Sequence, residues 1–246
     1  MRLHRFFVEQ PLRNTKEVIL REDGLVHQLK DVFRLRSGDK LILLDNFGLE
    51  FLAEIVSLDK NGAEMKILES TMVENIPKRE IWLFAALIKK DNFEFIVEKG
   101  TELGVSHFVP VLSDRSEKKN LNQERTLKII KESSEQSGRG TMPVLNEALK
   151  FDGVFDFAIE NNVKLIGFHP EGEKSVSEDP IRAQDKLNFG LKIKPEPIGS
   201  LIGPEGGWSE REIELFKSRT VPVYSLGKQT LRAETAAIAV SVLFLL

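Results

Sequence analysis

Two segments near the C-terminus constrain the fold more than any other part of the chain, because each joins an apolar stretch to a helix through a loop that contains glycine. The first is LIGPEGGWSERE, residues 201–212, and the second is LGKQTLRAETAAIAV, residues 226–240. Each apolar stretch predicts a buried strand, and Ser209 with Glu212 has the spacing of a capping box at a helix start. Open α/β sheets bind ligands at the carboxyl ends of neighbouring strands. The two loops therefore predict a ligand site.

The first loop favours a ligand without phosphate groups. Its spacing fits neither a Walker loop nor the GxGxxG fingerprint, and the carboxylate of Glu205 would repel a phosphate. A ligand that lacks phosphates, such as a cation, suits this loop, and a tight turn without any ligand is the alternative. In the second segment, Arg232 and Glu234 precede an apolar helix. They can serve a ligand or form an ordinary salt bridge.

The C-terminal two thirds of the chain alternates apolar strands with amphipathic helices, which predicts an α/β domain with a mostly parallel sheet. We expect helices capped at Asp91, from 123 to 137 with Leu127 and Ile130 inward, from 209 to 219, and from about 234. Gly100, within the first of these helices, indicates close packing of another backbone. The expected strands cover residues 81–88, 105–112, 163–168, 200–203 and 221–226. Residues 171–197, rich in charge and proline, should be irregular.

The first 72 residues predict a small β-barrel. Three apolar stretches, at 40–45, 49–58 and 63–68, are separated by tight turns, of which Asn61-Gly62 is the strongest hairpin signal. Asp23 is placed to cap a short helix. The segment 71–80, TMVENIPKRE, has no clear period, so the domain boundary is expected there, giving domains 1–72 and 73–246.

Composition excludes several kinds of site. The chain has no cysteine, which removes disulfides, thiol nucleophiles and zinc–thiolate centres. Its four histidines lack metal-site spacing, so we expect no metal. His107 is expected to be a satisfied core residue, and His169 to lie near the ligand edge. The N-terminus lacks a signal peptide and no apolar run is long enough to span a membrane, which predicts a cytoplasmic protein. The net charge of -3 gives no sign of a strongly basic nucleic-acid binder.

The two C-terminal segments together closely resemble the signature of the bacterial 16S ribosomal RNA (uridine-N3) methyltransferases, which are SPOUT-class enzymes. MRLHRFFV, KGTELGV and SEQSGR resemble the same family in the same order, so the likeness covers nearly the whole chain. It implies a PUA-like β-barrel that binds RNA, followed by a SPOUT-type α/β domain with a trefoil knot in its parallel sheet. The chain departs from the family pattern at Thr126, Gln229 and Ala233.

The resemblance implies that S-adenosylmethionine is the cofactor and that N3 of a specific uridine in the small-subunit (16S) ribosomal RNA is methylated by a homodimer. Arg232 would stabilise the uracil anion, and Glu234 would orient the base or accept its proton. The implied cofactor-binding residues are Leu201, Gly203, Pro204, Glu205, Gly206, Gly207, Leu226, Gly227, Leu231 and Thr235. A SPOUT methyltransferase for another RNA, such as transfer RNA, and a non-catalytic RNA-binding assembly protein are the alternatives.

Basic residues outside the two loops are candidate RNA contacts, because phosphate oxygens are commonly bound by arginine and lysine. Surface charge unrelated to RNA is the alternative for each. The candidates are Arg2, His4, Arg5, Arg34, Arg36, Arg115 and Arg139, with Lys118 and Lys119 beside Arg115.

Overall fold

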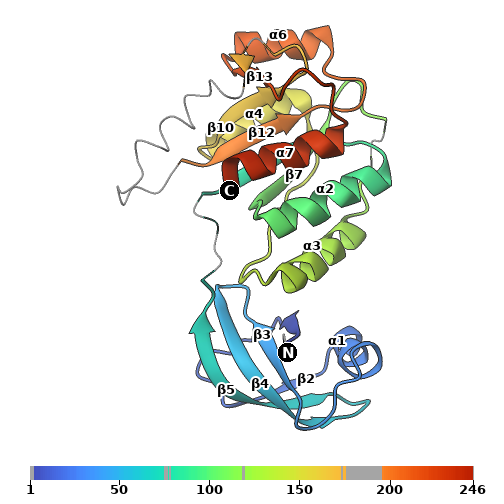
Figure 1. Cartoon of the computed structure of the whole chain (residues 1–246), viewed down its shortest axis with the longest axis vertical. Coiled ribbons are helices and arrows are strands. Elements are labelled where there is room, and N and C mark those ends of the chain that lie inside the picture. The colour runs from blue at the N-terminus through green and yellow to red at the C-terminus, as the bar shows by residue number, and fades with distance from the viewer. Residues whose placement is uncertain are drawn as a thin grey trace. The chain divides into compact units, whose positions relative to one another are not determined.

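The computed structural model describes residues 3–74, 77, 79–117, 120–172, 174–175 and 196–245. Its contacts divide the chain into two compact units, Met1–Ile76 with Ser134–Met142 and Pro77–Ser133 with Pro143–Leu246. Figure 1 shows a β-sheet in the first unit and helices around a second sheet in the other. Residues 134–142, inside the predicted domain 73–246, group with the first unit. The boundary near residue 72 stays a prediction.

The first unit is built on a five-stranded sheet in the order β1-β3-β4-β5-β2. β1 runs parallel to β3, and the other neighbours are antiparallel. The strands are β1 (Arg5–Phe7), β2 (Glu17–Leu20), β3 (Lys40–Leu44), β4 (Leu49–Leu58) and β5 (Ala63–Met72). The expected hairpin turn forms where Asp59 N–H donates to Gly62 O, 3.1 Å away. The sheet is a half-barrel, which confirms the predicted small β domain.

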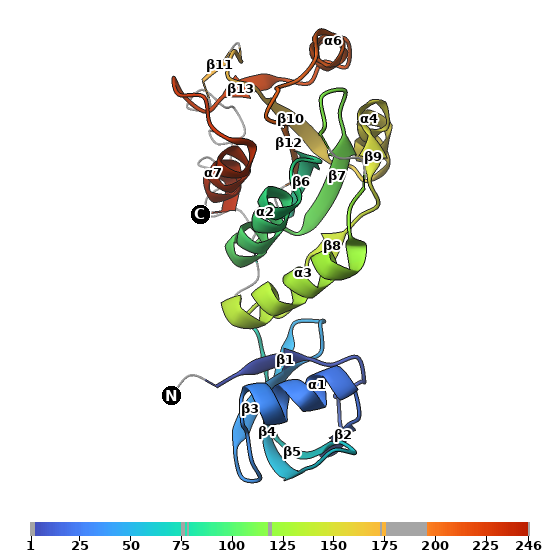
Figure 2. The same ribbon diagram turned by 90° about the vertical axis from the view of Figure 1, so that its right-hand side faces the viewer.

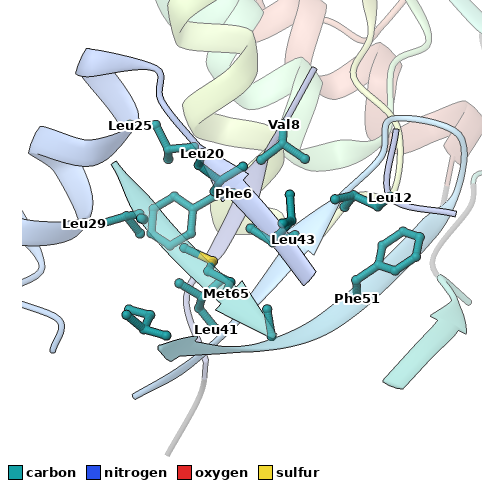
Figure 3. Packing of buried hydrophobic residues seen from close by; sticks show 14 residues of the cluster. Phe6, Val8, Leu12, Leu20, Leu25, Leu29, Leu41, Leu43, Phe51 and Met65 are labelled. Atoms are coloured by element: carbon teal, nitrogen blue, oxygen red, sulfur yellow. The ribbon is translucent and has the colours of Figure 1, made fainter. Parts of the chain in front are cut away.

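One apolar core fills this half-barrel. Figure 3 shows Phe6 from β1, Leu41 and Leu43 from β3 and Met65 from β5 converging, with Leu29 entering from the helical side. The helix α1 (Asp23–His27) continues into a π-helical turn, η1 (Gln28–Val32). The residue that precedes the helix is Glu22, without a side-chain cap bond, so the predicted capping role of Asp23 is wrong. Asp23 lies in the first turn, where a carboxylate faces the positive end of the helix.

The second unit contains an eight-stranded sheet in the order β11-β13-β10-β12-β6-β7-β8, with β9 also paired to β7. All of these pairings are parallel. The strands are β6 (Ile81–Ala86), β7 (His107–Leu112), β8 (Val144–Leu145), β9 (Leu149–Lys150), β10 (Lys164–Phe168), β11 (Lys174–Ser175), β12 (Ile198–Ile202) and β13 (Val223–Ser225). The central β6 and β12 are buried along their whole length, as parallel strands covered on both faces require. This confirms the predicted α/β fold, while the knot stays a prediction.

Helices cover both faces of this sheet. Figure 2 shows α2 and α7 side by side on one face and α4 on the opposite face. The helices of the unit are α2 (Lys90–Leu103), α3 (Gln123–Ser137), α4 (Phe151–Glu160), α6 (Glu210–Ser218) and α7 (Ala233–Leu245). Under α4, the rings of Phe151, Phe155 and Phe216 pack edge to face with centroids 5.3–6.2 Å apart. Trp208 joins this cluster, which fixes the loop that follows β12.

Several local predictions differ from the structure. Helix α2 begins at Lys90 after Lys89, so Asp91 is a first-turn residue and not the cap. Leu127, expected to point inward, is 51% exposed, whereas Ile130 is buried as predicted. At Gly100 a Cβ would meet the ring of Phe108 at 2.8 Å, so a side chain and not another backbone makes the close approach. Of the segment 171–197 expected to be irregular, most lies outside the described residues.

Candidate functional site

A pocket of about 350 Å³ lies at the carboxyl ends of β10, β12 and β13. Its lining comes from the end of β10, from the loops that follow β12 and β13, and from the first turn of α7. Among the described residues that line it, Glu171 and Glu205 carry full charges and no lysine or arginine does. A pocket with two carboxylates and no lysine or arginine among its described lining residues favours a cationic group over a phosphate.

The first loop, residues 203–209, is held by its own backbone and by a buried indole ring. Gly207 has φ of 68°, a left-handed conformation that favours glycine, and its N–H donates to Pro204 O at 2.8 Å. Trp208 is buried, and its Nε1–H donates to Phe168 O at 3.0 Å. A Cβ on Gly203 would lie 3.1 Å from the Trp208 ring, so the chain passes the indole closely only with glycine.

The capping box predicted after this loop is confirmed. Ser209 Oγ accepts the N–H of Glu212 at 3.2 Å, and the Glu212 carboxylate accepts the N–H of Ser209 at 2.8 Å. Glu212 is fully buried, and its other oxygen accepts the N–H of Asp114 from the loop after β7, at 2.9 Å. One carboxylate therefore joins the start of α6 to a second loop far away in sequence.

Arg115, next to Asp114, donates directly to the backbone of the first loop. Its Nη1 lies 2.8 Å from Gly206 O and 3.3 Å from Trp208 O. The side chain thus bridges two carbonyls on either side of Gly207. Its predicted contact with RNA stays a prediction, but the structure gives the guanidinium a different partner, the loop itself.

Asp114 forms the outer part of the same connection. Its carboxylate accepts from Arg211 Nε at 3.0 Å and Nη2 at 2.8 Å, and from Ser209 Oγ at 2.6 Å. The hydrogen bonds from Arg211 and Ser209 lower the pKa of Asp114 below its ordinary 3.8. Arg211 also donates to Asp152 at 2.6 Å. The loop after β7, helix α4 and helix α6 are linked here around one guanidinium.

The second loop, residues 226–232, makes far fewer contacts. Its hydrogen bonds are local, with Ser225 Oγ donating to Gly227 O at 2.9 Å and Gly227 N–H donating to Ser225 Oγ at 3.3 Å. Residues 227–232 are all exposed, and Gly227 has φ of 144°. The loop ends where Arg232 O accepts the N–H of Ala236, at the start of α7.

The structure brings most of the predicted cofactor residues together around the pocket. From the first loop these are Gly203, Pro204, Glu205, Gly206 and Gly207, and from the second they are Leu226, Gly227 and Leu231. Leu201 is buried inside β12 and Thr235 is exposed on α7, and neither lines the pocket. The cofactor role of all these residues stays a prediction.

Arg232 and Glu234 lie beside the pocket without lining it. Arg232 is exposed, and Glu234 is partly buried with its Oε2 atom hidden from solvent. In the part of the chain that the structure describes, that oxygen has no hydrogen-bond donor and the two side chains form no ion pair. The ordinary salt bridge considered for them is therefore absent between these two described residues. Their catalytic roles stay predictions.

Some lining residues were missed. Ser225 is the last residue of β13 and Glu171 lies three residues after the end of β10, and this place at the carboxyl ends of strands is the signal that could have found them. His169 lines the pocket, as expected from its place at a strand end. Gln229 and Ala233, two of the three departures from the family pattern, line it as well.

The candidate RNA contacts fall into different environments. His4, Arg5, Arg34 and Arg36 are partly or fully exposed in the first unit. Arg2, Lys118 and Lys119 lie outside the described residues. Arg139 is only 5% exposed, its Nε donates to Thr141 O, and burial lowers its pKa to about 10. The RNA contact predicted for Arg139 is not favoured, because a phosphate cannot reach a guanidinium buried this deeply.

His107 differs from its prediction. Its ring stacks on Trp82 with centroids 3.6 Å apart, and burial lowers its pKa below 6.5. It is partly exposed, and its buried Nδ1 lacks a hydrogen-bond partner among the described residues, so it is not a satisfied core histidine. Within the same described residues there is no cluster of histidine and carboxylate groups suited to a metal, and no helix is long and apolar enough to cross a membrane.

Comparison with known proteins identifies two family models along the chain. The model described as an RNA methyltransferase domain matches residues 74–244, and the model described as an RNA methyltransferase PUA domain matches residues 23–68. The protein named ribosomal RNA small subunit methyltransferase E of Rickettsia conorii is 31% identical, over 97% of this chain and 93% of its own length. Its namesake in Bacillus subtilis is 29% identical, over 95% and 93%.

Solved structures give the same relationship. A ribosomal RNA small subunit methyltransferase E from Neisseria gonorrhoeae, bound to S-adenosyl methionine, is 26% identical with a TM-score of 0.84 over 98% of this chain and 95% of that one. A Legionella pneumophila protein solved with the bound cofactor SAM is 26% identical with a TM-score of 0.86, over 99% and 97%. The likeness therefore extends over both units of the chain.

Proposed function

This chain belongs to the RNA methyltransferase family that includes ribosomal RNA small subunit methyltransferase E, and we propose that it methylates N3 of one uridine in the small-subunit (16S) ribosomal RNA, using S-adenosylmethionine. The relatives' names support the RNA, and the Neisseria structure supports the methyl donor. The observation that carries the proposal is the pocket at the strand ends, which is lined by both glycine loops and has no lysine or arginine among its described residues.

The residues present fit this donor. When bound, S-adenosylmethionine supplies an electrophilic methyl group on a positively charged sulfur and carries no phosphate. Glu171 and Glu205 give the pocket the matching negative charge, and Leu226, Leu231 and Ile202 provide apolar surface for a ring. The exposed backbone groups of the two loops can hydrogen-bond the polar edges of the ligand, as glycine-rich turns at strand ends commonly do.

The second loop places two charged side chains where the uridine must react. The base has to leave its stack to reach the donor, and its N3 proton must leave before the new bond to carbon forms. The negative charge then spreads over the uracil oxygens, where the exposed guanidinium of Arg232 can stabilise it. Glu234, whose Oε2 has no donor among the described residues, can orient the base or accept the proton.

We further propose that two copies of the chain associate through α7. From Ala236 onward, every residue of this helix except Ser241 is apolar, and the apolar residues are spread around its circumference. One side packs on α2, β6 and β12, yet Val242 is still 39% exposed. We also propose that the enzyme acts in the cytoplasm, where a ribosomal substrate would be found. Residues 1–72 would bind RNA and residues 73–246 would carry the reaction.

The proposal is tested with methyl-labelled S-adenosylmethionine and small ribosomal subunits from a strain that lacks the enzyme. The label should appear at N3 of a single uridine when the RNA is digested and mapped. Deproteinised RNA, assembled subunits and transfer RNA are offered in parallel, so that the preferred substrate is identified. Label confined to transfer RNA would support the alternative methyltransferase, and failure to bind the donor in a calorimetric titration would support a non-catalytic assembly protein.

A further inference from the structure

A second cavity, of about 160 Å³, lies within the first unit, and none of its lining residues belongs to the two glycine loops. Its walls come from the residues around the start of β1, from the residue that follows η1, and from the last turn of α3. All of these segments belong to the same compact unit. The lining residues are Leu3, His4, Arg5, Phe33, Glu135 and Gln136.

One wall of the cavity is aromatic and anchored in the core. The rings of His4 and Phe33 lie 4.2 Å apart at an angle of 47°. Phe33 in turn meets the buried ring of Phe6 edge to face, at 5.4 Å and 77°. Both His4 and Phe33 remain partly exposed. The wall therefore offers an aromatic surface to a ligand, and the contact with Phe6 holds the Phe33 ring in its orientation.

The rest of the cavity carries hydrogen-bonding groups of both kinds. The Nε of Arg5 is buried and has no hydrogen-bond acceptor among the described residues, while an Nη of the same side chain lies 3.6 Å from a Glu50 oxygen. Glu135 is buried and accepts the N–H of Phe7 at 3.0 Å, which fixes the position of its carboxylate. Gln136 adds an exposed amide, which both donates and accepts.

From this arrangement we propose that the cavity binds one unstacked base of the ribosomal RNA. Sequence-specific RNA recognition uses splayed bases that stack on aromatic or histidine rings and hydrogen-bond along their edges. The volume is below the roughly 300–1,000 Å³ of pockets for larger ligands, so it suits a single planar ring and not a whole nucleotide. The exposed Arg34 and Arg36, which follow Phe33 in the chain, are positioned in sequence to meet the adjoining phosphates.

This inference rests on the proposed function, because it takes ribosomal RNA as the substrate. It adds that the first unit recognises a base of the RNA and does not only attract its phosphates. The two kinds of contact differ in their response to salt. Loss of a phosphate contact lowers the slope of log affinity against log salt concentration by nearly one, whereas loss of a stacking contact leaves the slope unchanged.

The test compares Phe33→Leu with Phe33→Tyr in the full-length protein. Leucine keeps apolar contact with Phe6 but removes the π face, and tyrosine keeps the face. The probe is small-subunit ribosomal RNA transcribed in vitro, with affinity measured by filter binding at several salt concentrations. Phe33→Leu should bind roughly 10- to 100-fold more weakly with an unchanged salt slope, which is the loss that one base–aromatic stack produces. Phe33→Tyr should bind like the wild type.

Two further variants complete the design. Phe47→Ala removes an aromatic ring of the same unit that is 77% exposed and does not line the cavity, and this variant should bind RNA normally. Arg36→Ala should weaken binding and lower the salt slope. If Phe33→Leu loses its cooperative thermal transition, His4→Ala replaces it in the test. The same loss of affinity for RNA is expected of His4→Ala, and normal binding by it would overturn the inference.

The outcomes separate this inference from the proposed function. Wild-type methylation with a raised KM for RNA and an unchanged kcat in Phe33→Leu supports the inference. If the wild type methylates the RNA and Phe33→Leu binds it as tightly as the wild type does, the inference about the cavity is overturned and the proposed function stands. A wild-type protein that neither binds nor methylates the RNA overturns both.

Discussion

The two loops that border the pocket both contain glycine, three in residues 203–209 and one in residues 226–232, but they differ in how firmly the rest of the chain holds them. Residues 203–209 are fixed by Trp208, by the buried Glu212 and by Arg115 from a distant loop. Residues 226–232 are mostly exposed, and within the described part of the chain their hydrogen bonds involve Ser225, Gly227 and the start of α7. The side of the pocket formed by residues 203–209 is thus preorganised for a ligand.

This difference indicates a division of labour between the loops. A loop whose conformation is already fixed loses little entropy when it binds a ligand, and it can set the position of the methyl donor. A loop with few internal contacts can adapt to the donor, to the RNA or to a second copy of the chain, at the cost of being ordered on binding. The predictions below test the two loops separately.

The largest effect is expected in the second loop. Arg232→Ala should lower kcat for methylation roughly 100- to 1,000-fold, the loss typical of removing one donor to a developing anion. Donor affinity, measured by calorimetry, should stay near the wild-type value, because Arg232 does not line the pocket. Lys228→Ala, an exposed cation in the same loop, is the matched control. Near-normal methylation by Arg232→Ala would remove the role proposed for it.

A smaller effect, on binding, is expected at the start of the first loop. Gly203→Ala places a methyl group 3.1 Å from the Trp208 ring, which the buried indole can relieve only by moving the loop. We expect a loss of roughly 1–3 kcal/mol in the free energy of unfolding, as in other overpacked sites, together with weaker donor binding. Thermal unfolding and calorimetry measure the two effects. The control is Gly153→Ala in α4, where a Cβ meets no atom within 4 Å. Equal behaviour of the two variants would mean that the close approach at Trp208 is unimportant.

The two hydrogen bonds from Arg115 to the first loop should contribute less to donor binding than Gly203 does. Arg115→Ala removes donors to Gly206 O and Trp208 O, and we expect donor affinity to fall by about tenfold or less, as for loss of an exposed charge-assisted bond worth about 1 kcal/mol. Arg219→Ala, which removes an exposed ion pair to Asp156, serves as the control and should bind the donor normally. If Arg115→Ala weakens RNA binding and leaves donor affinity intact, the residue is an RNA contact, as the sequence suggested.

The smallest effect concerns pH. The pKa of Asp114 is lowered by its hydrogen bonds to Arg211 and Ser209. A carboxyl group with a lowered pKa in the folded state stabilises that state above its ordinary pKa, and the contribution is lost as the pH falls through the lowered value. The difference in unfolding free energy between the wild type and Asp114→Asn should therefore be constant between about pH 5 and 8 and shrink below about pH 4. Urea unfolding at each pH measures it, and a difference that changes around neutral pH would point to another group.

How much the sequence could predict depended on how local each feature was. The capping box of Ser209 and Glu212 follows from residues three apart, and the structure contains it. The meeting of the two glycine loops follows from a general property of parallel sheets, and both loops line one pocket. The bonds from Arg115 to Gly206 O and from Arg211 to Asp114 join residues more than 90 positions apart, and nothing in a single sequence pairs such groups.

The prediction for Leu127 failed for a related reason. Periodicity shows that a helix has an apolar side, but it does not show where the contact with the rest of the protein ends along that helix. Leu127 is half exposed although Ile130, one turn later, is buried. Likewise, Asp91 fits a cap by residue type, yet Lys89 occupies the cap position because the chain turns into α2 earlier.

The most direct test of the donor site is hydrogen exchange of the full-length protein with and without saturating S-adenosylmethionine. We predict that amides of residues 226–232 exchange quickly without the donor and become protected when it binds. Amides of residues 203–209 should be protected already and change little. If exchange slows in neither loop at a saturating concentration of S-adenosylmethionine, the assignment of this pocket as the methyl-donor site is contradicted.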